Sequence, residues 1–425
     1  MRRRPARHVD GADCTAAPGA AAIDAAIKVR DATGTVRARE SAVMPVSAER
    51  NRDFVGALES LRGLAVLTVL IFHSATFLRH GEEDPQQKTL WNLKSTDELL
   101  RRLFAVLFNG HIAVSLFFVL SGFVLALSLR RDNRCFVRKA GGFIARRFFR
   151  IYPALVINLC VTTAIVATLA ATFPEIAYSS YRWDQLAENL VLYDFGVNGA
   201  TWTLLIELLA IPLLLIGYLL AWRLGIGGLL TLAAGTIIVL FIPGLVRRVL
   251  PGESLFMFYL RLYLVDYQFM FVFGMLVAEF PIRDQLQNRS RVVAFAMVAA
   301  LVAMLIARLL LGYVSRWSLL IEAVAAATII GLLAYGPRLA VHNCLEWHSM
   351  RFVGRISYSF YLYHATAVTL LIPAAIWYMT TAELNAYPFF GSLIVATTGI
   401  IITLPIAWLS YYCIELPMLQ FGRRF

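Results

Sequence analysis

The stretch from Glu59 to Ser74, ESLRGLAVLTVLIFHS, is apolar enough to enter a membrane, yet it holds side chains that can do chemistry. Charged and titratable groups are costly in hydrocarbon and usually mark a site there. Arg62 and His73 are eleven residues apart, so on a helix they share one face and lie ~16 Å apart along the axis. The alternative interpretation is that Glu59 forms an interfacial ion pair with Arg62, while His73 only hydrogen-bonds a neighbouring helix.

A second pair of cations lies in ARRFFRIYP, from Ala145 to Pro153. Arg147 and Arg150 are three residues apart and therefore lie on one helical face, at the expected cytoplasmic mouth of a span. Paired guanidiniums bind phosphate through bidentate hydrogen bonds. Anchoring at the inner membrane surface explains Arg138 well, but Arg150 already lies within an apolar segment. The pair therefore predicts a phosphate-binding site.

Two more titratable side chains lie inside apolar segments. Glu207, in NGATWTLLIELL, is expected ~9 Å inside the start of its helix, and His364, in RFVGRISYSFYLYH, ~16 Å from the inner surface. An unpartnered carboxylate is costly at such a position. Together with His73, these residues come from three different spans and reach a similar mid-membrane depth. They are the candidate catalytic residues.

The composition identifies a membrane protein. Of 425 residues, 59% are hydrophobic and 16% charged, and the mean hydropathy is +0.68, which leaves too little polar surface for a soluble protein of this length. The net charge of +12 comes from basic clusters between apolar segments, a pattern typical of membrane orientation rather than of nucleic-acid binding. The five cysteines form no CxxC or metal-type cluster, so no disulfide or metal site is expected.

Apolar windows of roughly 20 residues predict an all-α, polytopic membrane bundle of about ten transmembrane helices in residues 53–425. The predicted spans are 57–79, 104–129, 148–172, 201–222, 226–246, 255–280, 292–313, 317–336, 353–378 and 388–412. Basic loops after the second and sixth spans predict that both termini are cytoplasmic. Residues 1–52 are basic and lack a hydrophobic signal-peptide core, so they predict a disordered cytoplasmic tail.

Several sequence segments, taken in their order along the chain, resemble the signature series of acyltransferase family 3. The members of this family are integral-membrane enzymes that O-acylate sugars and other extracytoplasmic acceptors. The resemblance rests on RG followed by the run to His73, then HIAVSLFFVLSGFVL, ARRFFRIYP, WTLLIE, GRISYSFYLYH and YYCIELPMLQFGRR. It implies a catalytic histidine at His73 and a requirement for Arg62 and the Arg147/Arg150 pair. It also implies acyl-coenzyme A as co-substrate, with no permanently bound cofactor, and the stand-alone branch without a fused hydrolase-like domain.

The resulting prediction is a multi-pass acyltransferase of the cytoplasmic (inner) membrane. It would move an acyl group, by default acetyl, from cytoplasmic acyl-coenzyme A to a hydroxyl of an extracytoplasmic glycan such as exopolysaccharide or O-antigen. The three arginines would bind the donor, and His73 would act as general base at a pKa suited to that task. Glu207 or His364 would orient His73 or hold the acceptor. An acyl-histidine intermediate is the alternative order of events.

Two other classes of protein share parts of this pattern. A proton-coupled transporter would also use intramembrane histidine and glutamate, but inverted repeats common in transporters are not visible in the sequence. An inactive scaffold is the third class, and the intact set of site residues disfavours it. The acceptor stays open among exopolysaccharide, O-antigen, a lipid-linked glycan and a macrolide-like product, and the sequence leaves homodimerisation open.

Overall fold

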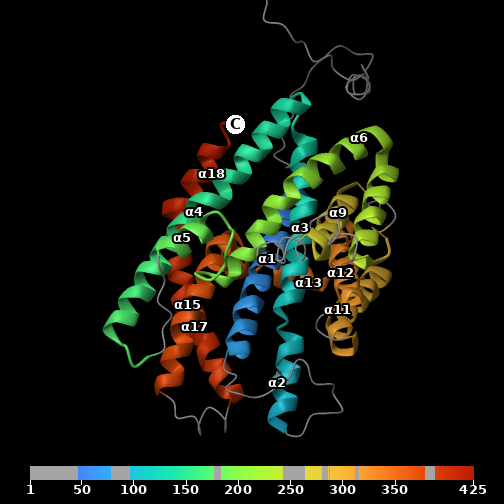
Figure 1. The fold of residues 1–425 in the computed structure, drawn as a ribbon. Coiled ribbons are helices and arrows are strands. Elements are labelled where there is room, and N and C mark those ends of the chain that lie inside the picture. The colour runs from blue at the N-terminus through green and yellow to red at the C-terminus, as the bar shows by residue number, and fades with distance from the viewer. Residues whose placement is uncertain are drawn as a thin grey trace, which may run out of the picture.

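The computed structural model describes residues 46–77, 96–176, 183–242, 264–279, 286, 288–311, 315–378 and 388–425. Within these ranges the chain is helical and has no strand, as Figure 1 shows. By length and composition, seven of the described helices could cross a membrane. The predicted helical membrane bundle is thus confirmed, while the total of ten spans and the side of the termini stay predictions. Residues 1–45 of the predicted tail, and residues 255–263 of the sixth predicted span, lie outside the described residues.

The described helices follow one another along the chain without an intervening sheet. They are α1 (Val46–Phe77), α2 (Thr96–Leu107), α3 (Gly110–Arg131), α4 (Phe136–Thr172), α5 (Trp183–Leu190), α6 (Trp202–Phe241), α9 (Gln268–Glu279), α11 (Ser290–Leu311), α12 (Arg316–Tyr335), α13 (Ala340–Leu345), α14 (His348–Arg355), α15 (Ser357–Tyr378), α17 (Pro388–Ser410) and α18 (Leu416–Gly422). The 3₁₀ turn η3 (Gly199–Thr201) precedes α6, and the π-helical turn η4 (Tyr411–Glu415) precedes α18.

Helix α1 lies among α3, α14, α15 and α17 and contacts all four. Its contact with α14 is a backbone-to-backbone approach, because a Cβ added to Gly354 would lie 1.8 Å from the carbonyl oxygen of Glu59. Small residues allow membrane helices to pack at such close range. Helix α1, which carries Arg62 and His73, is therefore unbroken and is packed against these neighbouring helices.

Several helix boundaries differ from the predicted spans. The second predicted span, 104–129, is broken at Asn109, whose side chain accepts a hydrogen bond from the backbone N–H of His111 and so caps α3. Helix α4 begins at Phe136, well before the predicted start at 148. The basic stretch that was expected to be a loop is therefore largely helical, and it presents its arginines on defined faces.

The fourth and fifth predicted spans are the two arms of α6. They meet at Gly225, whose φ of 60° and ψ of −147° turn the chain, a conformation that glycine adopts without steric cost. The arms fold back on each other, since a Cβ at Gly228 would lie 2.6 Å from the carbonyl oxygen of Leu220. Figure 1 shows the arms running in opposite directions. The break between 222 and 226 was thus predicted correctly.

The chain that enters α6 is buried within the protein. Asn198 is 3% exposed and Thr201 is fully buried. The Asn198 amide donates to Asn158 Oδ1 (2.7 Å) and to the carbonyl of Leu362 (2.9 Å), and its Oδ1 accepts from the backbone N–H of Ala200 (3.0 Å). These bonds satisfy the polar backbone of a turn that lies between α4 and α15, so α6 begins inside the protein.

Candidate active site

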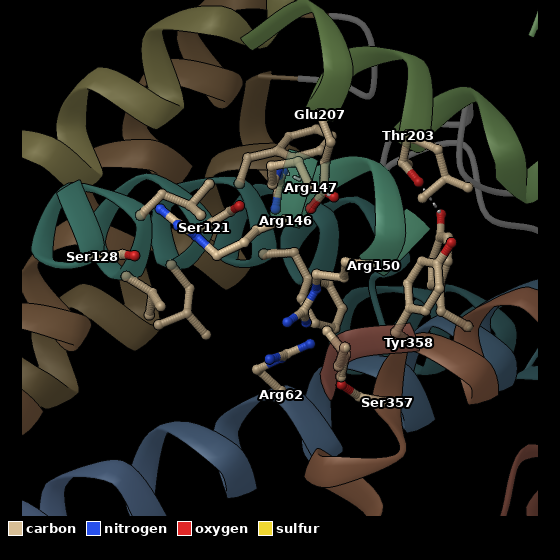
Figure 2. Close-up of a pocket in the computed structure, with 18 of the residues that line it drawn as sticks. Arg62, Ser121, Ser128, Arg146, Arg147, Arg150, Thr203, Glu207, Ser357 and Tyr358 are labelled. Carbon is tan, nitrogen blue, oxygen red and sulfur yellow. Dashed lines mark hydrogen bonds and ion pairs between the residues drawn. The ribbon is translucent and has the colours of Figure 1, made fainter. Parts of the chain in front are cut away.

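A basic cavity of about 330 Å³ lies between α1, α3, α4, α6, α15 and α18. Five guanidinium side chains line it, from Arg62, Arg146, Arg147, Arg150 and Arg423. Among its described lining residues, one carboxylate, that of Glu207, opposes them. Figure 2 shows four of these arginines, Arg62, Arg146, Arg147 and Arg150, and Glu207 around the open space. The structure therefore brings all three arginines that were predicted to bind the donor to a single cavity.

Arg62 and Arg150 come from different helices and face each other across this cavity (Figure 2). Within the described part of the chain, neither forms an ion pair with a carboxylate. Glu59, the alternative partner predicted for Arg62, instead pairs with Arg351 of α14, with 3.7 Å between Oε2 and Nε. The interpretation of Arg62 as half of an interfacial pair with Glu59 is therefore wrong. Facing guanidiniums repel each other, so the pair favours an anion between them.

Arg147 and Glu207 form the ion pair inside the cavity. Arg147 Nη2 lies 3.2 Å from Glu207 Oε2, and the two side chains are 6% and 21% exposed. The angle at Arg147 does not fit a hydrogen bond, and its Nε also lacks an acceptor among the described residues. Arg147 is thus close enough to its carboxylate for charge balance but keeps donors for another ligand.

His73 meets His364, as the depth argument predicted for this pair. Their ring centroids are 5.5 Å apart with 32° between the ring planes. His364 is fully buried, and its Nδ1 is hydrogen-bonded to the backbone carbonyl of Tyr361. Because a carbonyl can only accept, Nδ1 carries the proton, and Nε2 is left with a lone pair. That Nε2 has no hydrogen-bond partner among the described residues, so it is available as a base.

Tyr361 connects the histidine pair to the basic cavity. It lines the cavity, and its ring centroid is 5.2 Å from that of His364. Its hydroxyl donates to the carbonyl of Ala200 (3.2 Å) and accepts from Thr203 Oγ1 (3.1 Å). Neither histidine is among the described residues that line the cavity. Of the three candidate catalytic residues, Glu207 therefore lines the cavity, while the histidine pair lies outside that lining, with the ring of Tyr361 packed against His364.

Glu207 was predicted to orient His73 or to hold the acceptor. In the structure its carboxylate forms an ion pair with Arg147. A catalytic role for Glu207 stays a prediction.

Sequence reasoning missed three residues of this region. Arg146 is four residues before Arg150 and so shares its face, a spacing that could have identified it. Arg423 reaches the cavity only through the packing of α18 on α4, which no local pattern reveals. Glu415 is 3% exposed, lies in η4 and accepts a hydrogen bond from Ser359 (2.9 Å); π-helical turns are frequent at functional sites.

A second buried ion pair lies outside the cavity lining. Arg308 of α11 donates two hydrogen bonds to Glu322 of α12, and Ser115 of α3 donates to Glu322 Oε2 (2.9 Å). The three side chains are each at most 5% exposed. With its carboxylate satisfied from two helices, the cluster ties α3, α11 and α12 together.

Comparison with known proteins gives a consistent result. The family model of an acyltransferase domain, that of acyltransferase family 3, matches residues 55–412. A curated relative, the acyltransferase MdmB of Streptomyces mycarofaciens, is 36% identical over 107 residues, which cover 23% of this chain and 26% of that protein. The match thus spans about a quarter of the relative. No solved structure matches the chain.

Proposed function

The chain belongs to acyltransferase family 3, and from that premise we propose that it is a membrane O-acyltransferase that uses acyl-coenzyme A. The acyl group, by default acetyl, would pass from the cytoplasmic donor to a hydroxyl of an extracytoplasmic glycan such as exopolysaccharide or O-antigen. The protein would lie in the cytoplasmic membrane. The proposal depends on one observation above all, which is the cavity whose cations outnumber its carboxylates.

The unpaired guanidiniums support a phosphate-bearing donor. Arg62 and Arg150 face each other (Figure 2), and neither forms an ion pair with a carboxylate of the described residues. Arg147 retains free donors. Guanidiniums bind phosphate through two parallel hydrogen bonds, which are roughly twice as strong as neutral ones. The diphosphate of coenzyme A supplies the anion that these three side chains require.

The length of α1 supports the path of the thioester. Arg62 lies at the cavity and His73 beside His364, and eleven residues of unbroken helix separate them by ~16 Å. An extended pantetheine arm is of comparable length. Tyr361 lies on this path, so rotation of its side chain would open the cavity toward the histidine pair.

The chemistry needs one base and one leaving group. His73 takes the proton from the acceptor hydroxyl as general base, the oxygen attacks the thioester carbonyl carbon, and the carbon–sulfur bond breaks as the ester forms. The imidazolium then returns the proton to the coenzyme A thiolate. The alternative is attack by a histidine nitrogen to give an acyl-histidine, followed by transfer to the hydroxyl.

The test combines analysis of the acylated product with a measurement of donor binding. Mass spectrometry of surface glycans from a strain lacking the gene should show a missing acyl group that the wild-type chain restores and His73→Ala does not. In a second measurement, the purified protein in lipid nanodiscs should bind coenzyme A. Restoration by a well-expressed His73→Ala protein would overturn the catalytic assignment. Solute uptake without acylation would favour the alternative, a proton-coupled transporter.

A further inference from the structure

The cavity holds more positive charge than a diphosphate needs. Its lining includes five guanidiniums and one carboxylate, which give a formal charge of +4. Arg62, Arg147 and Arg150 suffice to surround a diphosphate. Arg146 and Arg423 are left over, and we call these two the outer arginines.

The outer arginines lie at one end of the cavity. Arg146 is four residues before Arg150 in α4, ~6 Å nearer the start of that helix. Figure 2 shows its side chain reaching along the cavity toward Ser121, away from Arg62 and Arg150. The side chain of Arg146 therefore lies apart from Arg62 and Arg150, the two arginines that face each other across the cavity.

Helix α18 delivers Arg423 to the same end. A Cβ at Gly422 would lie 3.6 Å from the Cα of Arg146 and 3.2 Å from the Cβ of Phe149. The ring of Phe421 meets that of Phe149 edge-on, with centroids 4.9 Å apart. This packing fixes the residue that follows Gly422 beside Arg146, and both side chains line the cavity.

The charge on the outer arginines is only weakly balanced. Asp132 Oδ2 lies 3.5 Å from Arg146 Nη2, but the same carboxylate is held more closely by Arg134, at 2.8 Å. The hydrogen bonds from Arg134 keep the pKa of Asp132 well below its usual range, so its charge persists but is shared. Arg423 has no carboxylate partner among the described residues. Arg423 is thus available to a second anion, and Arg146 shares its own carboxylate with Arg134.

We propose that Arg146 and Arg423 form a separate subsite for a phosphate monoester, the 3′-phosphate on the ribose of coenzyme A. This inference rests on the proposed function. The ribose holds its 3′-phosphate apart from the 5′-diphosphate, which matches two separate groups of cations. A monoester carries ≈ −1.5 to −2 charge near pH 7, enough to engage both guanidiniums. The subsite selects coenzyme A thioesters over acyl carriers that end at a pantetheine phosphate.

The test compares two ligands that differ in this phosphate alone. The affinities of coenzyme A and 3′-dephospho-coenzyme A are measured on the purified full chain in nanodiscs. The wild-type chain should bind coenzyme A at least tenfold more tightly, because charge-assisted contacts are strong. Arg423→Gln should weaken coenzyme A about tenfold and leave 3′-dephospho-coenzyme A unchanged. That unchanged affinity also reports that the variant is folded.

Two variants serve as controls. Arg424→Gln removes the neighbouring charge, which stacks over Phe421 with its guanidinium carbon 5.5 Å from the ring centre and does not line the cavity; it should change neither affinity. Arg150→Gln should weaken both ligands alike. Equal wild-type affinities for the two ligands would overturn the outer subsite and leave the proposed function standing. No binding of either ligand would instead contradict the coenzyme A donor itself.

Discussion

Replacing Glu207 with glutamine tests whether Glu207 is only the charge partner of Arg147 or is itself a catalytic residue. Glutamine keeps the shape of the side chain and removes its charge, so the guanidinium 3.2 Å away loses its carboxylate. Breaking a fully buried pair from one side costs about 3–5 kcal/mol, whereas an exposed pair contributes about 0–1 kcal/mol. Since Glu207 is 21% exposed and Arg147 is 6% exposed, we expect Glu207→Gln to lower the free energy of unfolding of the free protein by about 1–3 kcal/mol.

Bound donor should reverse this loss. A phosphate in the cavity gives Arg147 a new anionic partner, and the variant no longer repels that phosphate from Glu207. We therefore expect saturating coenzyme A to raise the thermal unfolding temperature more in Glu207→Gln than in the wild type, and the KM for acyl-coenzyme A to fall. Intrinsic fluorescence of the protein in nanodiscs gives the unfolding curves. Glu207→Asp, which keeps the charge, is the matched control and should stay closer to the wild type.

The kinetic result can refute this reasoning. General acid–base catalysis typically contributes 10²–10⁴-fold to a rate, whereas a charge partner that does not touch the reacting atoms should change kcat by less than about tenfold. A loss of 10²-fold or more in kcat, with unchanged donor affinity, would show that Glu207 is catalytic. In that case its ion pair with Arg147 would be incidental.

Three further predictions use kinetics and stability. Arg150→Lys should raise the KM for acyl-coenzyme A about tenfold, because an ammonium cannot form the two parallel hydrogen bonds of a guanidinium. Arg138→Lys, outside the cavity, should leave the KM unchanged. Equal KM values for the two variants would assign Arg150 to membrane anchoring. Gly274→Ala would place a Cβ 2.0 Å from a carbonyl oxygen of α3 and should cost at least about 1–3 kcal/mol in unfolding measurements, while Gly235→Ala, with open space at its Cβ, should cost nothing; similar stabilities would contradict this packing. His364→Gln should lower kcat about 10²-fold with little change in KM, and a wild-type kcat would remove His364 from the chemistry.

Helical periodicity predicted the arrangement wherever a helix is continuous. Helix α1 runs unbroken from Val46 to Phe77, so the spacing of Arg62 and His73 fixed both their face and their separation. The same holds for Arg147 and Arg150 on α4. In each case the residues meet side chains from other helices: Arg62 and the arginine pair line one cavity, and His73 contacts His364. Their catalytic and binding roles stay predictions.

Long-range packing could not be read from local patterns. No local pattern indicates Arg351 as a partner for Glu59. Helix α14 can approach α1 this closely because Gly354 has no Cβ, and this approach brings Arg351 to Glu59. Arg423 reaches the cavity because Phe421 and Phe149 pack together. Each of these contacts joins segments that are far apart in the chain, and a single sequence carries no signal of such pairing.

The ion pair of Glu207 depends on the buried turn before α6. The sequence predicts that Glu207 lies ~9 Å from the start of its span at residue 201, and a span that starts at a membrane surface leaves its first backbone N–H groups to water. In this protein Asn198 caps the turn with its own side chain and donates to α4 and α15, so the chain can turn while buried. The first turns of α6 then lie beside α4, and Glu207 meets Arg147. The burial of Asn198 arises from contacts with α4 and α15, far away in the chain, so the local sequence could not predict the ion pair between Glu207 and Arg147.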